Sequence, residues 1–341
     1  MVALERYSRQ MLFKPIGEEG QAKILQSRAV VVGMGALGTV VANHLVRAGV
    51  GHVRIIDRDI VEHSNLQRQI LYTEEDAARN LPKVIAAEKR LKKINSEVLI
   101  EPILSDVNLD NAEELLVGFD VIIDGTDNFL TRYLINDVAI KHGIPWVYGG
   151  AVSSRGMFAT IIPGKTPCYR CLFPQVPQGL GDTCDTIGVL SPITDIIGSF
   201  EAMEALKLLV GAETNPNLDQ LDIWYNSFLQ MDISEGHDPN CPACVKHEYE
   251  FLDRTSDKQI VFTSLCGRDT VQINPRQKIR LDFSETAERL KKSGKVEMNP
   301  YMLRFSPNED ITMVFFLDGR VLIHGLSDPV QAKNYYAKYN G

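Results

Sequence analysis

The sequence has few of the features that would place a protein in a membrane or on nucleic acid. It contains no run of 18 apolar residues and therefore no expected membrane span. Residues 1–6 lack the apolar core of a signal peptide, so we expect a cytoplasmic protein. Basic residues number 36 against 44 acidic ones, which gives a net charge of −8. Because proteins that bind phosphate backbones usually carry a basic surface, no nucleic-acid partner is expected.

Internal repeats and low-complexity tracts are also absent, and the composition is that of an ordinary globular protein. The 341 residues are 44% hydrophobic and 23% charged. This length suits one large domain and a smaller one. The pattern changes after Lys246, so we expect a first domain at 1–249 and a small module at 250–341.

Strand and helix patterns alternate through the first half of the chain. Short apolar runs predict strands at 29–32, 53–56, 98–103 and 120–124, with another beginning near 145. Helical spacing occupies the segments between them, at 36–48, 83–95 and 129–142. This alternation predicts an α/β fold with a Rossmann-like, doubly wound and mainly parallel sheet, which binds ligands at the carboxyl edge of its strands.

Beyond residue 150 the pattern is less regular. We expect a strand at 157–163, a long loop at 164–192, a strongly apolar helix at 193–209 and a strand at 221–228. The last segment predicts a small α+β module, with strands near 270–274, 301–306, 311–317 and 320–324 and helices near 284–292 and 327–338.

A glycine-rich turn links the first expected strand to the first expected helix. Gly33, Gly35 and Gly38 allow a tight turn and the approach of phosphate to backbone N–H groups at a helix N-terminus. Asp57 stands 19 residues after Gly38, where an acid hydrogen-bonds a ribose hydroxyl. The turn predicts a bound nucleotide but does not choose between NAD, FAD and ATP. The alternative is a packing turn without a ligand.

Two cations and two amides follow this turn. Arg68 lies in a polar loop between Asn65 and Gln69, and these groups match phosphate oxygens. Lys83 stands at the start of a helix, against the helix dipole, which indicates that something negative holds it. The alternative is a pair of solvated surface cations. As a set they favour a triphosphate, because an enzyme that cleaves ATP must stabilise charge on the leaving pyrophosphate.

Acidic residues follow the fourth expected strand. Asp127 is predicted to bind Mg²⁺, which usually takes one or two carboxylates plus substrate phosphates. The alternative for Asp124 and Asp127 is a helix N-cap, and we expect Asp124 to be structural. Arg9, judged from the residues alone, is a surface arginine.

Four of the six cysteines form two Cys-x-x-Cys pairs, Cys168/Cys171 and Cys241/Cys244. Four thiolates complete a tetrahedral Zn²⁺ site without an open position, so a structural zinc is predicted. Four buried thiols are the alternative. Cys184 stands apart in a polar loop that suits a nucleophile, although two flanking aspartates oppose a thiolate there. Cys266 is expected to be a buried apolar residue.

The chain from about 5 to 250 resembles the ThiF/MoeB family, bacterial relatives of the ubiquitin-activating enzymes. The matching segments are Arg6–Gln10, Gly33–Gly38, Asp57–Gln69, Pro82–Lys83, Asp124–Asn128 and the two cysteine pairs. The resemblance implies a homodimer that uses ATP and Mg²⁺ to adenylate the C-terminal Gly-Gly carboxylate of a ubiquitin-like sulfur carrier, releasing pyrophosphate.

The resemblance also implies roles for individual residues. Asn65, Arg68 and Lys83 would stabilise the triphosphate, Asp57 would hold the ribose and Asp127 the Mg²⁺, with Gln69 and Asn128 completing the nucleotide site. Arg9 is similar to an arginine that reaches the phosphates of the neighbouring subunit. Cys184 matches a cysteine that is linked to the activated carrier in the thiamine branch, where a cysteine desulfurase or a rhodanese would donate the sulfur.

The branch is not settled by these residues. We favour a ThiS-type carrier of thiamine biosynthesis because the chain lacks a rhodanese domain and carries a C-terminal module. A MoaD-type carrier of molybdopterin biosynthesis is the alternative. Less favoured readings are activation of a carboxylate on tRNA, a zinc-stabilised binding module and a NAD-dependent oxidoreductase, which would leave Arg68, Lys83 and Asp127 without a role.

Overall fold

The computed structural model describes residues 5–176, 187–253, 262–264, 270–273, 280–326 and 328–340. The chain divides into two compact units, residues 1–253 and 254–341. Each unit is described by itself.

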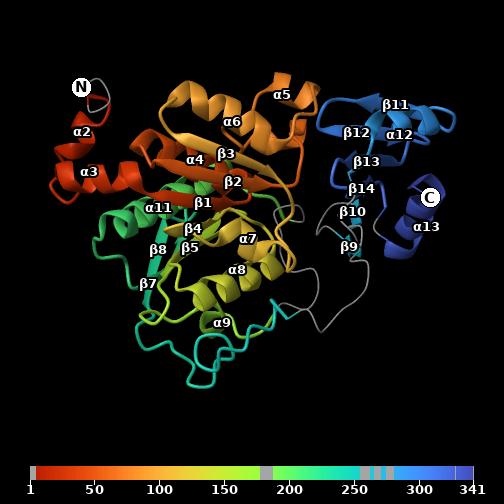
Figure 1. Ribbon diagram of the computed structural model, residues 1–341. Helices are drawn as coiled ribbons and strands as arrows, with labels where there is room; N and C mark the ends of the chain where they lie inside the picture. The colour runs from red at the N-terminus through yellow and green to blue at the C-terminus, as the bar shows by residue number, and fades with distance from the viewer. Residues whose placement is uncertain are drawn as a thin grey trace. The chain divides into compact units, whose positions relative to one another are not determined.

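The first unit is built on an eight-stranded sheet among its described residues, in the order β3-β2-β1-β4-β5-β6-β7-β8 (Figure 1). Strands β3, β2, β1, β4 and β5 are parallel, and β6 to β8 continue the sheet in antiparallel fashion. The strands are β1 (Arg28–Val32), β2 (His52–Asp57), β3 (Leu99–Leu104), β4 (Val121–Asp124), β5 (Trp146–Val152), β6 (Arg155–Ile161), β7 (Asn217–Asp222) and β8 (Ser227–Asp232).

The strand order confirms the predicted Rossmann-like, doubly wound fold. The chain leaves β1 toward β2 and β3 and then returns to the other side of β1 to form β4. The order therefore reverses between β1 and β4, and open α/β sheets bind their ligands at such a reversal, outside the carboxyl ends of the strands.

Helices cover both faces of this sheet. On one face α4 packs against α6 and α11, and on the other α7 packs against α8 (Figure 1). The helices are α2 (Ser8–Met11), α3 (Gly17–Gln26), α4 (Ala36–Ala48), the 3₁₀ helix η1 (His63–Asn65), α5 (Glu74–Ala78), α6 (Lys83–Ile94), α7 (Ala112–Leu116), α8 (Phe129–His142), α9 (Tyr169–Leu172) and α11 (Ser191–Val210). None of the helices in the described part of the chain is long and apolar enough to cross a membrane.

The predicted single strand at 221–228 is wrong. The chain forms a hairpin of β7 and β8 there, and Asn226 in the turn has φ +53°. Asp222 closes this turn by accepting the backbone N–H groups of Trp224 and Tyr225. The predicted loop 164–192 contains α9, and its centre, residues 177–186, lies outside the described residues.

The second unit is the predicted α+β module. Its described strands form a six-stranded antiparallel sheet in the order β11-β12-β13-β14-β10-β9, and α12 packs on β11 and β12. The elements are β9 (Phe262–Ser264), β10 (Thr270–Ile273), α12 (Phe283–Leu290), β11 (Lys295–Met298), β12 (Met302–Ser306), β13 (Thr312–Phe316), β14 (Val321–His324) and α13 (Pro329–Asn340). Its core includes Leu303, Phe305, Met313 and Phe315. The polar strand β11 was not predicted.

Candidate nucleotide site and metal centre

The glycines of the turn after β1 have different structural roles. Gly33 has φ +92°, and a Cβ there would lie 2.6 Å from the carbonyl oxygen of Gly125. A Cβ on Gly38 would lie 1.9 Å from the carbonyl oxygen of Gly33. At Gly35 the nearest atom to such a Cβ is 3.8 Å away. The protein itself therefore requires two of the three glycines, and Gly35 leaves open space beside the N-terminus of α4, where a phosphate can approach.

Asp57, at the carboxyl end of β2, holds the glycine turn in place. Its carboxylate accepts the backbone N–H groups of Met34 and Asp59, each at 2.7 Å. The Tyr72 hydroxyl donates to the carbonyl oxygen of Met34 at 2.7 Å, so both peptide groups of this residue are fixed. Burial raises the pKa of Asp57, an effect that Lys83 partly opposes. Sequence reasoning missed Tyr72, which lies far from the turn along the chain.

Lys83 is buried and paired with a carboxylate. Its side chain is 4% exposed, and its Nζ lies 3.0 Å from Oδ2 of Asp59. The backbone N–H of Lys83 also donates to the carbonyl oxygen of Asp59 at 2.9 Å. The lysine at the start of α6 is thus held by a negative group, as its position against the helix dipole predicted. Its contact with a phosphate stays a prediction.

The segment from Asn65 to Gln69 is a compact turn. The carbonyl oxygen of Asn65 accepts the backbone N–H groups of Arg68 and Gln69 at 3.1 and 3.0 Å. The side chains of Asn65 and Gln69 are buried. Oε1 of Gln69 is buried without a hydrogen-bond partner among the described residues. The Nε2 atom of the same side chain, a hydrogen-bond donor, lies 4.0 Å from the position of a Cβ on Gly35, so this amide borders the open space there.

Arg68 is half-buried and carries no carboxylate partner within the described ranges. Its guanidinium donates to the carbonyl oxygen of Ser64 at 3.1 Å. Neighbouring Arg58, in contrast, lies 3.0 Å from Asp106. A cation without a countercharge at the sheet edge fits an anionic ligand better than a paired one does.

Asp124 and Asp127 have opposite environments. Asp124 is fully buried and accepts from Arg132 Nε at 2.7 Å and from the Thr126 N–H at 2.9 Å, so it is structural. Asp127 is exposed, and the N-cap of α8 is Asn128, whose side chain accepts the N–H of Leu130 at 2.8 Å. The N-cap alternative for Asp127 is therefore wrong, and its carboxylate stays available for a ligand.

Arg58 lies among the carboxylates of the predicted site, a position that sequence reasoning missed. Burial disfavours its charge, but Asp106 and the nearby Asp59, Asp127 and Asp57 raise its pKa above the usual value. These carboxylates lie at or after the ends of three strands, β2, β3 and β4. Arg58 therefore lies where these strand ends converge. The available signal was its position directly after Asp57 at the end of β2.

Arg9 does not join the other site residues within one chain. It is exposed on α2, and Gln10 beside it donates to the carbonyl oxygen of Ala48 at 3.1 Å. Ala48 is the last residue of α4, a helix that starts at the carboxyl edge of the sheet and ends at the amino edge. Arg9 therefore lies at the edge opposite the glycine turn.

The two cysteine pairs form one cluster. The Sγ atoms of Cys168 and Cys171 are 3.8 Å apart, those of Cys168 and Cys241 3.6 Å, and those of Cys171 and Cys244 3.5 Å. All four sulfur atoms lie within 4.8 Å of one another. Tetrahedral zinc with bonds of about 2.3 Å places its sulfur ligands about 3.8 Å apart, so the cluster fits this metal. Cys184 and Cys266 lie outside the described residues.

Comparison with known proteins identifies the family. The model of the ThiF family matches residues 7–243, a span that includes the glycine turn, Arg68, Lys83 and Asp127. The chain belongs to the ThiF family. The predicted resemblance is therefore confirmed.

Relatives cover different lengths of this ThiF-family chain. It is 45% identical to the sulfur carrier protein ThiS adenylyltransferase of Bacillus subtilis over 337 residues, 98% of this chain and 99% of that protein. It is 38% identical to the sulfur carrier protein adenylyltransferase of Thermus thermophilus over 77% of this chain and 97% of that protein. Identity with the adenylyltransferase and sulfurtransferase MOCS3 of Anopheles gambiae is 40%, over 77% of this chain and 58% of that protein.

Solved structures show the same fold. E. coli MccB, crystallised with ATP, superimposes with a TM-score of 0.60 at 22% identity, over 70% of this chain and 74% of that one. A second MccB structure, with MccA-N7isoASN, gives a TM-score of 0.62 at 23% identity over the same shares.

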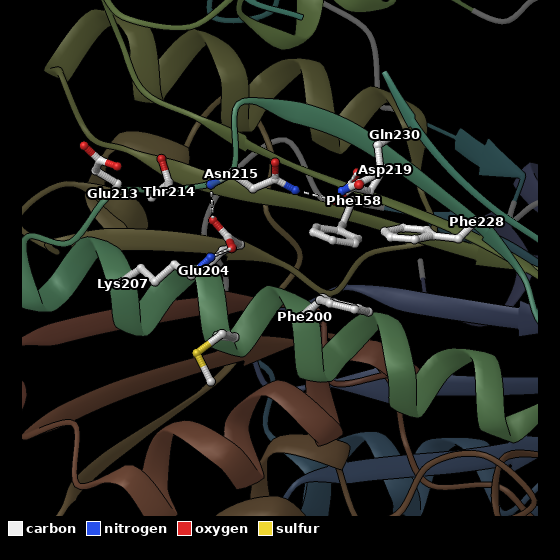
Figure 2. A pocket seen from close by; sticks show the side chains of 11 residues that line it. Phe158, Phe200, Glu204, Lys207, Glu213, Thr214, Asn215, Asp219, Phe228 and Gln230 are labelled. Carbon is white, nitrogen blue, oxygen red and sulfur yellow. Dashed lines mark hydrogen bonds and ion pairs between the residues drawn. The ribbon is translucent and has the colours of Figure 1, made fainter. Parts of the chain in front are cut away.

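A separate groove of about 470 Å³ lies between α11 and the β7–β8 hairpin (Figure 2). Phe158 and Phe200 stack within it with ring centroids 4.6 Å apart, and Phe228 lies beside them. Its other end is polar, where Glu204 pairs with Lys207 at 2.5 Å. No predicted nucleotide-binding residue lines this groove.

Proposed function

We propose that this chain uses ATP to adenylate the C-terminal Gly-Gly carboxylate of a ubiquitin-like sulfur carrier of the ThiS type, releasing pyrophosphate. One observation carries the proposal: the 45% identity to the Bacillus ThiS adenylyltransferase extends over 98% of the chain, second unit included. The match to the MOCS3 protein of Anopheles covers 77% of the chain. A MoaD-type carrier is therefore the second candidate.

In the proposed reaction the carrier's carboxylate attacks the α-phosphorus of ATP, and no covalent enzyme group is required. Catalysis then depends on positioning and on stabilising charge at the leaving pyrophosphate. The open space at Gly35 and the first turn of α4 would take phosphate oxygens. Arg68 and Lys83 would neutralise charge on the triphosphate, and Asn65 would stabilise it by a hydrogen bond. Gln69 and Asn128 would complete its contacts. Asp57, already fixed by two N–H groups, would accept from the ribose.

Mg²⁺ would bind at Asp127. This carboxylate is exposed beside the glycine turn and does not cap α8, and hard oxygen ligands suit this ion. When bound, the ion would neutralise charge on the phosphates.

A homodimer would complete each site. Arg9 lies at the amino edge of its own sheet, so it could reach only the phosphates bound by a second copy of the chain.

The cluster of Cys168, Cys171, Cys241 and Cys244 would hold a structural Zn²⁺. Metal analysis should give one zinc per chain; protein that keeps its fold and its melting temperature after zinc removal would contradict this role.

A sulfur-transfer step would follow adenylation. Cys184 would be linked to the activated carrier, and a cysteine desulfurase or a rhodanese would supply the sulfur. Cys184→Ser should therefore retain adenylation and lose thiocarboxylate formation. Loss of both would assign the cysteine a different role.

Pyrophosphate exchange into ATP tests the proposed function. Purified carriers ending in Gly-Gly are offered one at a time, each with a matched version that lacks the last two glycines. We expect exchange with an intact ThiS-type carrier and none with its truncated form. Exchange with a MoaD-type carrier alone would assign the chain to the molybdopterin branch. NADH consumption without pyrophosphate exchange would contradict adenylation and indicate a redox enzyme.

A further inference from the structure

We propose that Arg132 is a positioning residue that holds residues 125–128 in the conformation in which Asp127 faces the metal–nucleotide complex. The proposal rests on the proposed function. Arg132 lies in the second turn of α8 and touches no expected substrate position, so any effect on the reaction must pass through this loop, here called the Asp127 loop.

The guanidinium of Arg132 joins three parts of the sheet edge. Its side chain is buried, and Nε donates to Oδ2 of Asp124 at 2.7 Å, at the end of β4. Nη2 donates to the carbonyl oxygen of Thr126 at 2.7 Å and to that of Gly149 in β5 at 3.1 Å. One rigid, planar group therefore links the end of β4, the middle of β5 and the loop that follows β4.

The Asp127 loop is held from both sides. Both peptide groups of Thr126 are fixed, because its N–H donates to Asp124 and its carbonyl accepts from Arg132. On the other side, the Gly125 N–H donates to the carbonyl of Val32 at 2.7 Å. A Cβ on Gly125 would lie 2.4 Å from the carbonyl oxygen of Gly33. Gly125 and Thr126 are thus held between the glycine turn and the guanidinium, and Asp127 follows them directly in the same loop.

The location of these bonds separates positioning from general stabilisation. Arg54 provides a comparison, because it also pairs with a carboxylate, Glu101, through Nε and Nη2 at 2.9 Å each. Its third bond goes to the carbonyl of Leu115, at the end of α7. Both arginines link separate elements, but of the two only Arg132 donates to the loop that carries Asp127, the predicted Mg²⁺ ligand. Mutation of a residue that hydrogen-bonds to a metal ligand typically lowers metal affinity by about 10- to 100-fold.

The double substitution Asp124→Asn with Arg132→Gln tests the proposal, because it removes the bonds without leaving an unpaired buried charge. Amide hydrogen exchange at residues 125–128 is measured in the nucleotide-free protein and should become about tenfold faster or more. Calorimetry with a non-hydrolysable ATP analogue should show binding weakened about tenfold in Mg²⁺ and unchanged within about twofold in EDTA. Arg132→Lys, which retains the charge, serves as a second variant with a smaller loss.

The matched control is Arg54→Gln with Glu101→Gln, which should leave loop exchange and Mg²⁺-dependent binding at wild-type levels. Wild-type exchange at 125–128 in the Asp124/Arg132 variant would overturn the proposal. Equal loss of Mg²⁺-dependent binding in both double variants would also overturn it, since that indicates general destabilisation. Wild-type protein that binds no nucleotide would contradict the proposed function, whereas the exchange rates of the loop would still decide the role of Arg132.

Discussion

At the scale of single residues, the cations of the candidate site differ in whether a carboxylate of the protein pairs with them. Lys83 and Arg58 each lie 3.0 Å from a carboxylate oxygen, of Asp59 and Asp106 respectively. Arg68 has a carbonyl partner and no carboxylate in the described part of the chain. A phosphate would therefore gain most from Arg68, because the other two must share their charge.

Arg68→Ala should lower pyrophosphate exchange by roughly 10²- to 10³-fold, the usual cost of removing one transition-state donor. Stability should change little, because among the described residues the side chain makes one hydrogen bond, to the Ser64 carbonyl. The control is Arg79→Ala, which removes an exposed arginine that pairs with Glu75. Near-normal exchange in the Arg68 variant, or equal losses in both variants, would contradict the assignment.

Glu201 predicts a pH dependence of stability. It is fully buried, and neither carboxyl oxygen has a hydrogen-bond partner among the described residues. Burial, with Asp124 nearby, raises its pKa well above 4.5. Between 4.5 and the raised value, the folded protein retains a proton that the unfolded chain has released. The free energy of unfolding therefore falls as pH rises through this window.

Glu201→Gln should remove the contribution of Glu201 to this slope. We expect the variant to be more stable than the wild type by on the order of 1–3 kcal/mol at pH 8, with the difference vanishing toward pH 4. Urea unfolding across this range measures it. The exposed control Glu75→Gln should stay within about 0.5 kcal/mol of the wild type. A Glu201 variant that is less stable at pH 8 would show that the charged carboxylate is needed.

At the scale of elements, the sequence predicted what depends on local periodicity. Alternating strands and helices placed Asp57 and Asp127 after strands of one sheet, and the structure has them there. The β7–β8 hairpin was missed because all six residues of β8 are exposed, so no alternation marks it. The contact of Tyr72 with Met34 was missed because the two residues are distant in sequence. The contacts of Arg132 were missed because β4, the loop after it and β5 meet at this side chain only in the folded sheet.

The glycine turn gives a prediction at this scale. Gly38→Ala should destabilise the fold by about 2 kcal/mol or more, because its Cβ would meet the Gly33 carbonyl oxygen at 1.9 Å. Gly35→Ala should stay within about 0.5 kcal/mol of the wild type and weaken ATP binding, because its Cβ would occupy open space. Thermal unfolding and calorimetry separate the two effects. Unimpaired ATP binding by the Gly35 variant would place the phosphates elsewhere.

At the scale of the whole molecule, the proposed role of Arg9 requires a second chain, because Arg9 lies at the amino edge of its own sheet. The proposed dimer predicts complementation between two inactive proteins, Arg9→Ala and Arg68→Ala. In a mixed dimer, the Arg9→Ala chain keeps its own Arg68 and receives Arg9 from its partner, whereas the other site lacks both arginines. Random mixing of subunits should therefore restore about a quarter of wild-type exchange, by the same positioning argument that makes each arginine necessary. No recovery after verified subunit exchange would contradict a shared site.

The central claim is that a triphosphate lies at the carboxyl edge of the sheet and is cleaved between its α and β phosphates. The most direct measurement incubates the enzyme and an intact ThiS-type carrier with ATP labelled either at the α or at the γ phosphate. The account predicts a carrier that gains the α label and never the γ label, with the γ label recovered in pyrophosphate. A carrier that acquires the γ label, or no label from either nucleotide, would contradict it.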